Sequence, residues 1–393
     1  MPEKNRLTLF VLLSAATLTV MTGAIISPVQ NLIRDGLGID AAYAGLIITT
    51  HGLFMAIFSP FMGSLIDRKG VRGPFIAGLY LFGIAGGSGL LINSYWPLIT
   101  SRAVMGIALS GIFTCINVII LNTYEGERRD KVMGWRGSAQ SLGGIIWPPL
   151  GGLLGDMSWH LPFSIYLFAI PLGITAYTAI KNPVTYDRKN FQPEEDISIF
   201  TITKNSPVIL IIFGLVFFSS FQLYAIVIHI PQLLELFGVT SSLKISSYIV
   251  SMATAAGLMS LIYGKIRVRL SYHAISTVGV LMWVIVFYII SIARSQLTIM
   301  ISVFFLGASQ GMIMPTVMAW IGEVVPASFR GRFSSYLGTF GFMGQFLSPI
   351  LLAPALIHFG IRNVFTASSI VGLVWFIILL PGLGKKNKNR HPF

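Results

Sequence analysis

Long apolar stretches separated by short polar segments dominate this sequence. A helix that crosses a bilayer needs about 20 mostly apolar residues, and each stretch approaches or exceeds that length. The pattern predicts membrane-spanning helices at residues 7–33, 41–66, 74–92, 97–122, 133–155, 162–180, 207–234, 245–263, 273–293, 296–322, 333–357 and 363–383. The sequence therefore predicts an all-α integral membrane protein with 12 transmembrane helices.

A polar segment at residues 181–206 divides the predicted helices into two sets of six. The predicted parts are an N-terminal half (1–180), a central cytoplasmic loop (181–206) and a C-terminal half with a basic tail (207–393). The halves repeat at an offset of 201 residues, which relates Gly63 to Gly264, Gly106 to Gly307, Arg129 to Arg330, Gly137 to Gly338, Gly143 to Gly344, and Pro148 to Pro349. Parallel repeats of this kind occur in transporters whose substrate site lies between the halves.

The distribution of Lys and Arg predicts the orientation. The chain has 27 Lys and Arg against 14 Asp and Glu, yet only 10% of its residues are charged, whereas soluble domains carry about 25%. With the N-terminus inside, the outer loops hold only Arg34, Lys244, Arg294 and Arg362. Because basic residues favour the cytoplasmic side, both termini are predicted there, in a multi-pass protein of the cell inner (plasma) membrane. Topology thus explains the positive charge, and nucleic acid is not an expected partner.

A charged motif joins the second and third predicted helices, and its members are Gly63, Asp67, Arg68, Gly70 and Arg72. It resembles the loop signature of the major facilitator superfamily. The resemblance implies that Asp67 accepts hydrogen bonds at the start of the eleventh helix and latches the halves in the outward-open state, assisted by Arg72. The alternative is charge that only sets topology. The glycines are expected to permit a tight reversal of the chain.

The fifth predicted helix carries a motif made of Gly143, Gly144, Trp147, Pro148, Gly151 and Gly152. It is similar to the antiporter motif of exporters in the superfamily, with Trp147 in place of a glycine. The resemblance implies the drug:proton antiporter branch, and the small residues predict close helix packing. Trp147 would either line a cavity or face lipid.

Two further stretches resemble motifs of the same superfamily. Gly264, Arg267 and Arg269 form a degenerate copy of the charged motif in the second half, without the Asp. In the fourth helix, Arg102 and Gly106 resemble an Arg-x-x-x-Gly motif, which implies that Arg102 influences the protonation of a neighbouring carboxylate. The alternative is an Arg side chain that extends to the membrane interface.

The carrier of a coupled proton is not obvious from the sequence. None of the Asp and Glu residues lies at the middle of a predicted span, although many drug:proton antiporters carry an embedded acid. His51 in the second helix and His229 in the seventh are candidates, since histidine titrates in the physiological range. Asp35, at the outer end of the first helix, is a third. Each histidine could instead be neutral and hydrogen-bonded between helices.

Uncharged polar residues deep in the spans suggest a polar cavity. The candidate substrate-binding residues are Thr22, Asn117, Gln140, Gln222, Gln310, Met314 and Gln345. Each amide could instead form hydrogen bonds between helices. With abundant Phe, Met and Trp around it, such a cavity suits amphipathic solutes, because these side chains adapt to several shapes.

The sequence therefore predicts a transporter of the major facilitator fold, and no enzyme, cofactor or metal site. The favoured function is proton-coupled export of amphipathic or lipophilic compounds by a monomer in contact with membrane lipid. One alternative is an exporter or facilitator of one dedicated metabolite, such as a siderophore, sugar or lipid, with or without proton coupling. A more remote alternative is a transporter-like receptor, which would normally need an added soluble domain.

Overall fold

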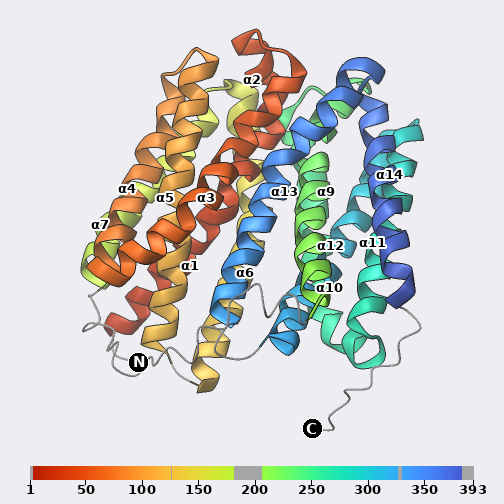
Figure 1. The fold of residues 1–393 in the computed structure, drawn as a ribbon. Coiled ribbons are helices and arrows are strands. Elements are labelled where there is room, and N and C mark those ends of the chain that lie inside the picture. The colour runs from red at the N-terminus through yellow and green to blue at the C-terminus, as the bar shows by residue number, and fades with distance from the viewer. Residues whose placement is uncertain (1–2, 125, 181–205, 326–329, 383–393) are drawn as a thin grey trace. The chain divides into compact units, whose positions relative to one another are not determined.

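The computed structural model describes residues 3–124, 126–180, 206–325 and 330–382. In these ranges, one helix or a run of two or three joined helical segments occupies each predicted span (Figure 1). The N-terminal half holds α1 (Glu3–Ile26), η1 (Ser27–Val29), α2 (Gln30–Leu37), α3 (Ala41–Lys69), α4 (Arg72–Gly87), η2 (Ser88–Leu90), α5 (Tyr95–Thr123), α6 (Gly126–Met157), η3 (Leu161–Phe168) and α7 (Ala169–Ala179). The C-terminal half holds α9 (Val208–Glu235), α10 (Ser242–Arg269), α11 (Tyr272–Ile292), α12 (Gln296–Val324), α13 (Arg330–Phe359), α14 (Ile361–Leu379) and η6 (Leu380–Gly382).

The described residues group into two compact units. The first contains the described residues up to 180 together with Thr240–Ser247, and the second contains residues 206–239 and those from Tyr248 onward. The first six residues of α10 therefore group with the N-terminal helices, while the rest of that helix belongs to the second unit. The predicted boundaries at 180 and 206 stay a prediction, since the central loop lies outside the described residues.

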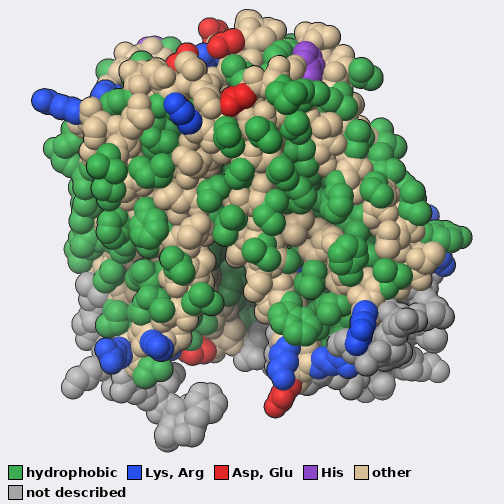
Figure 2. Space-filling model, turned by 180° about the vertical axis from the view of Figure 1, so that it is seen from behind, with side chains coloured by type: hydrophobic (Ala, Val, Ile, Leu, Met, Phe, Trp, Pro, Cys, Tyr) green, Lys and Arg blue, Asp and Glu red, His purple; other side chains and the backbone are tan. Residues whose placement is uncertain are grey.

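Apolar helices of membrane-spanning length make up most of the described chain. Within the described ranges, eleven helical segments are long and apolar enough to cross a bilayer. Helix α6 is not among them, because charged residues fill its first turns and glycine and proline its second half. Large apolar side chains are exposed, such as Leu261 at 81% and Trp96 at 74%, and hydrophobic side chains are spread over the face shown in Figure 2. Such surfaces suit contact with lipid chains.

Glycines at equivalent positions set the packing of both halves. A Cβ atom at Gly106 of α5 would strike the backbone of His51 in α3, and one at Gly307 of α12 would strike the backbone of Met252 in α10. Both the glycines and the residues they contact are 201 positions apart. The repeat in the sequence is therefore also a repeat of helix contacts, in which small residues let two backbones approach closely.

The charged motif does not form the glycine-lined loop that its sequence predicts. Gly63 lies inside α3, which continues to Lys69, and α4 begins at Arg72. Only Gly70 turns the chain, with a φ of 77° in the region that disfavours other residues. The expected role of Gly63 in the reversal is therefore wrong, because Gly63 lies within the predicted span 41–66, and α3 continues three residues past that span to Lys69.

Candidate functional site

Arg72 ties the charged motif to the N-terminal half. Its Nη2 atom donates a hydrogen bond to the carbonyl oxygen of Tyr177 in α7 at 2.8 Å, and its guanidinium lies 4.5 Å from the centre of the Tyr177 ring. The side chain of Asp67, predicted to act as the latch, lies outside the described residues. The latch therefore stays a prediction, as does the part of Arg68, whose side chain is exposed.

Arg102 is fully buried within the first unit. Its Nη2 donates to the carbonyl oxygens of Gly86 at 3.0 Å and Ala85 at 3.4 Å. These are carbonyls at the C-terminal end of α4, where the helix dipole favours a positive charge. The guanidinium also lies 5.1 Å from the ring centres of both Phe163 and Tyr166. With 0% of the residue exposed, the alternative of an Arg that reaches the interface does not hold in this structure.

Buried polar contacts link His51 through Thr22 to Tyr166, one of the two aromatic residues beside Arg102. The Nε2 atom of His51 lies 2.8 Å from the hydroxyl of Thr22 in α1. The hydroxyl of Tyr166 donates to the carbonyl oxygen of the same Thr22 at 2.9 Å. His51 and Thr22 are each 2% exposed. An imidazole, a hydroxyl and a guanidinium from different helices thus share one buried region, and this region is the candidate functional site of the first half.

The corresponding place in the second half carries no charge. The offset of 201 residues relates Arg102 to Val303 and His51 to Met252. Val303 is 1% exposed and Met252 is 6% exposed. Since uncharged, apolar residues occupy both positions in the second half, the fold alone does not require an Arg and a His there.

The antiporter-like motif of the fifth predicted span lies in α6, and its glycines pack this helix closely against α1. A Cβ atom at Gly143 would lie 3.1 Å from the carbonyl oxygen of Thr17, and one at Gly151 would lie 2.5 Å from that of Ile25. Trp147 is half-buried, and its Nε1 donates to the carbonyl oxygen of Thr17 at 3.2 Å. Its ring is therefore fixed against α1, while Gly144 is partly exposed, Pro148 and Gly152 are buried, and the helix continues through the proline.

Several candidate substrate-binding amides bond to neighbouring helices. Gln222 of α9 donates to the carbonyl oxygen of Ser368 in α14 at 2.8 Å, and Gln310 of α12 accepts a hydrogen bond from the hydroxyl of Ser219 at 2.8 Å. Both contacts lie within the second unit. These geometries match the interhelical alternative and leave a substrate role as a prediction.

The two amides of the first unit behave in the same way. Gln140 of α6 donates to the hydroxyl of Thr19 at 2.7 Å, and the side-chain oxygen of Asn117 accepts from Arg136. Of the other candidates, Gln345 is buried and Met314 is partly exposed.

The remaining proton-carrier candidates differ in surroundings. His229 of α9 is 2% exposed, and its Nδ1 lies 3.3 Å from Oε1 of Gln232 one turn further along the helix. Asp35 is exposed and forms an ion pair of 2.7 Å with its neighbour Arg34. No Asp or Glu is buried among the residues whose burial is described, and no group of three or more metal-ligating side chains occurs in that same part of the chain.

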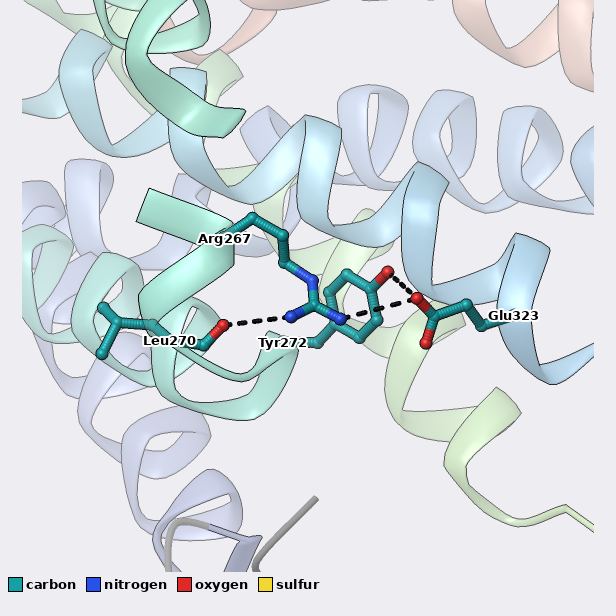
Figure 3. Close-up of polar contacts among 4 residues, drawn as sticks. All are labelled: Arg267, Leu270, Tyr272 and Glu323. Carbon is teal, nitrogen blue, oxygen red and sulfur yellow. Dashed lines mark hydrogen bonds and ion pairs between the residues drawn. The ribbon is translucent and has the colours of Figure 1, made fainter. Parts of the chain in front are cut away.

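A charged cluster at the end of α10 was not anticipated from the sequence. The guanidinium of Arg267 donates to the carbonyl oxygen of Leu270 at 3.2 Å, pairs with Glu323 of α12 at 3.5 Å, and lies 3.7 Å from the ring centre of Tyr272 (Figure 3). The Tyr272 hydroxyl donates to the same carboxylate. The degenerate charged motif that contains Arg267 was the available signal, but its partner lies 56 residues further along. The cluster braces α10, α11 and α12 within the second unit.

The family follows from a comparison of the whole sequence. Residues 12–275 and 244–393 match the sequence profile of the Major Facilitator Superfamily. The chain belongs to the major facilitator superfamily. Its fold is therefore the major facilitator fold, with two six-helix halves, and the chain is a multi-pass membrane transporter of small molecules.

Relatives of this superfamily member include proteins named for drug efflux. The multi-drug resistance efflux pump PmrA of Streptococcus pneumoniae is 26% identical over 366 residues, which cover 89% of this chain and 90% of that protein. The multidrug resistance protein MdtG of Yersinia enterocolitica is 26% identical over 379 residues, covering 93% and 90% of the two chains. The resemblance to the multidrug branch of the superfamily is thereby confirmed.

Solved structures of other transporters share the fold. A bacterial homologue of the human lysosomal transporter Spinster, in an inward-facing and unoccupied conformation, superimposes with a TM-score of 0.79 at 15% identity and covers 97% of this chain and 96% of its own. A mutant form of the nucleoside transporter NupG gives a TM-score of 0.79 at 12% identity, with 96% and 100% covered. Identities this low support the fold and nothing about substrate.

Proposed function

We propose that this transporter exports amphipathic or lipophilic small molecules from the cytoplasm in exchange for protons, by alternating access of its two halves. The observation that carries the proposal is the similarity to PmrA and MdtG over about nine-tenths of each chain. The antiporter-like motif of α6 supports it, because Gly143 and Gly151 seat this helix on α1. The antiporter-like motif therefore helps α6 pack against α1 within the N-terminal half.

The region around His51 is the proposed site of proton coupling. An imidazole can bind and release a proton near neutral pH, and His51 contacts the hydroxyl of Thr22 at 2.8 Å. Gly106, which packs on the backbone of His51, is one turn along α5 from Arg102. A proton on His51 would place a second positive charge near that guanidinium. Protonation would therefore disfavour this arrangement, and that is the kind of coupling an antiporter needs.

The transport reaction itself can be measured in proteoliposomes. The purified full chain is reconstituted, and counterflow and efflux of a panel of lipophilic cations and neutral dyes are followed with and without an inward-directed pH gradient. Gradient-driven movement of several unrelated compounds is the expected result. Thermal unfolding of the reconstituted protein checks that it is folded. If the folded protein moves none of these compounds, multidrug export is contradicted.

Replacing His51 with glutamine is expected to flatten the dependence of transport on pH. Burial beside the Arg102 guanidinium opposes protonation of His51 in this arrangement, so the proton is expected to bind in the state that opens this region to water, where an imidazole titrates at about pH 6.5. Wild-type transport should therefore depend on pH. Glutamine keeps a hydrogen-bonding group but cannot take up a proton. His229→Gln tests the other candidate, since His229 is equally buried at 2% exposed and lies in the other half, and its profile is expected to stay like that of wild type if His51 is the carrier. Unchanged profiles in both variants and in the double variant would rule out histidine as the carrier.

A dedicated exporter or facilitator is the second candidate. The observation that favours it concerns the residues whose burial the structure describes. No Asp or Glu among them is buried, so this part of the chain offers no embedded carboxylate that could accept a proton. This candidate predicts exchange of one solute class in the same vesicles, at a rate that does not respond to the pH gradient.

Both termini are proposed to lie in the cytoplasm. The support is the small number of basic residues in the alternate loops, of which Arg34, Arg294 and Arg362 are examples. A single cysteine placed at Ser94, between α4 and α5, is expected to react with an impermeant maleimide added to intact cells. If Ser94→Cys is labelled only after the cells are opened, the proposed topology is contradicted and the opposite orientation is indicated.

A further inference from the structure

A carboxylate from α6 caps the first turn of α10. Asp156 accepts hydrogen bonds from the backbone N–H of Ser242 at 2.5 Å and of Leu243 at 3.3 Å, and from the hydroxyl of Ser241 at 2.8 Å. The oxygen of Ser241 accepts from the N–H of Lys244 at 3.3 Å. These N–H groups have no partner within the helix. All three are therefore satisfied, and a negative charge meets the positive end of the helix dipole.

Glycines bring the two helices into contact at the same place. A Cβ atom at Gly152 would lie 2.6 Å from the carbonyl oxygen of Ser242 and 2.9 Å from Cα of Leu243. One at Gly155 would lie 3.5 Å from the hydroxyl of Ser242. Gly152 is the last glycine of the antiporter-like motif and precedes Asp156 by one turn. A glycine contact and a carboxylate cap thus converge on one turn of α10.

The repeat shows that this cap is specific to one half. The offset of 201 residues relates Asp156 to Ile357, which cannot cap a helix, and Ser241 to Asp40. Asp40 directly precedes α3 and makes no side-chain bond to the start of that helix. The carboxylate that serves α10 therefore comes from a different helix, and the fold does not demand such an arrangement at the equivalent helix.

The capped turn is the part of α10 that groups with the N-terminal half. Thr240–Ser247 belong to the first unit, and the helix from Tyr248 onward belongs to the second. Rocking of one half against the other must change how the ends of such a helix are held. We propose that Asp156 is a positioning residue for transport, whose carboxylate stabilises the state in which α10 begins against α6 and so sets the balance between the two access states. This inference rests on the proposed alternating access.

The test measures that balance directly. Spin labels are placed at Leu91 and Leu236, which are exposed at 86% and 63%, in a Cys115→Ser background that removes the only cysteine. Distances between the labels are recorded in nanodiscs without substrate or pH gradient. Asp156→Ala is expected to shift the ratio of short to long distances toward long ones by about tenfold, because charge-assisted hydrogen bonds to the helix are lost. Asp156→Asn keeps one acceptor oxygen and should give a smaller shift.

A matched variant and a second measurement keep the outcome decisive. Asp40→Asn, at the equivalent helix start, is expected to leave the distances unchanged. If Asp156→Ala does not fold, then Asp156→Asn and Ser241→Ala each remove part of the cap, and distances equal to wild type in both would overturn the proposal. The measurement needs no transported compound. A protein that fails to export dyes can still show the shift, so failure of the proposed function and failure of this inference are distinguishable.

Discussion

Replacing Arg102 with methionine is expected to lower the transport rate at least about tenfold, and to lower the free energy of unfolding by about 2 kcal/mol. The stability loss arises because two buried carbonyls at the end of α4, those of Ala85 and Gly86, lose their charged donor. A buried acceptor left without a partner costs about 1–3 kcal/mol. The larger effect on transport is expected because the same guanidinium lies beside the region of His51. Rates in proteoliposomes, scaled to folded protein, and thermal unfolding in detergent measure the two effects separately.

Arg362→Met is the matched control for Arg102→Met. Arg362 of α14 also donates to helix-end carbonyls, those of Ser291 at 3.1 Å and Ala293 at 2.7 Å. Its substitution is expected to reduce stability while leaving the rate per folded protein within about twofold of wild type. Equal rate losses in both variants would mean that Arg102 acts only as a cap on α4.

Replacing Gly106 with alanine is expected to abolish correct folding of the N-terminal half. The added Cβ would strike the carbonyl group of His51, and backbone cannot move aside as a side-chain tip can. Overpacking of a core costs about 1–3 kcal/mol when neighbours can adjust, and here both neighbours are helix backbones. We expect the folded yield to fall by more than about tenfold. Gly307→Ala should behave alike, since its Cβ would strike Met252.

Gly264→Ala provides the control for these glycine variants. No described atom lies within 4 Å of a Cβ at this position, and the residue lies inside α10. Alanine is favoured over glycine inside a helix by about 1 kcal/mol. The folded yield should therefore be at least equal to wild type. Size-exclusion profiles of the fluorescent-tagged variants compare all three, and a normal profile for Gly106→Ala would contradict the packing argument.

The sequence alone determined the helices and their repeat. A helix that spans a bilayer needs an apolar run of sufficient length. The length of such a run can be read from a short stretch of sequence, without knowing what the helix packs against. The offset of 201 residues was also visible, because the glycines at each close helix contact, such as Gly106 and Gly307, recur in both halves. The end of the second helix was less accurate, since α3 continues to Lys69, three residues past the predicted end, and Gly70 makes the turn.

Only the tertiary structure decided which polar groups meet. His51 contacts Thr22, which is 29 residues away in the sequence. Gln222 bonds to Ser368 across 146 residues, and Asp156 bonds to Ser242 across 86 residues. Each pair depends on how helices rotate about their axes and cross, and composition does not encode either quantity locally. For the same reason, the sequence left open whether Arg102 extends to the membrane interface or is buried between helices. The bilayer fixed the number and length of the helices, while the packing of their faces fixed the partners of the buried charges.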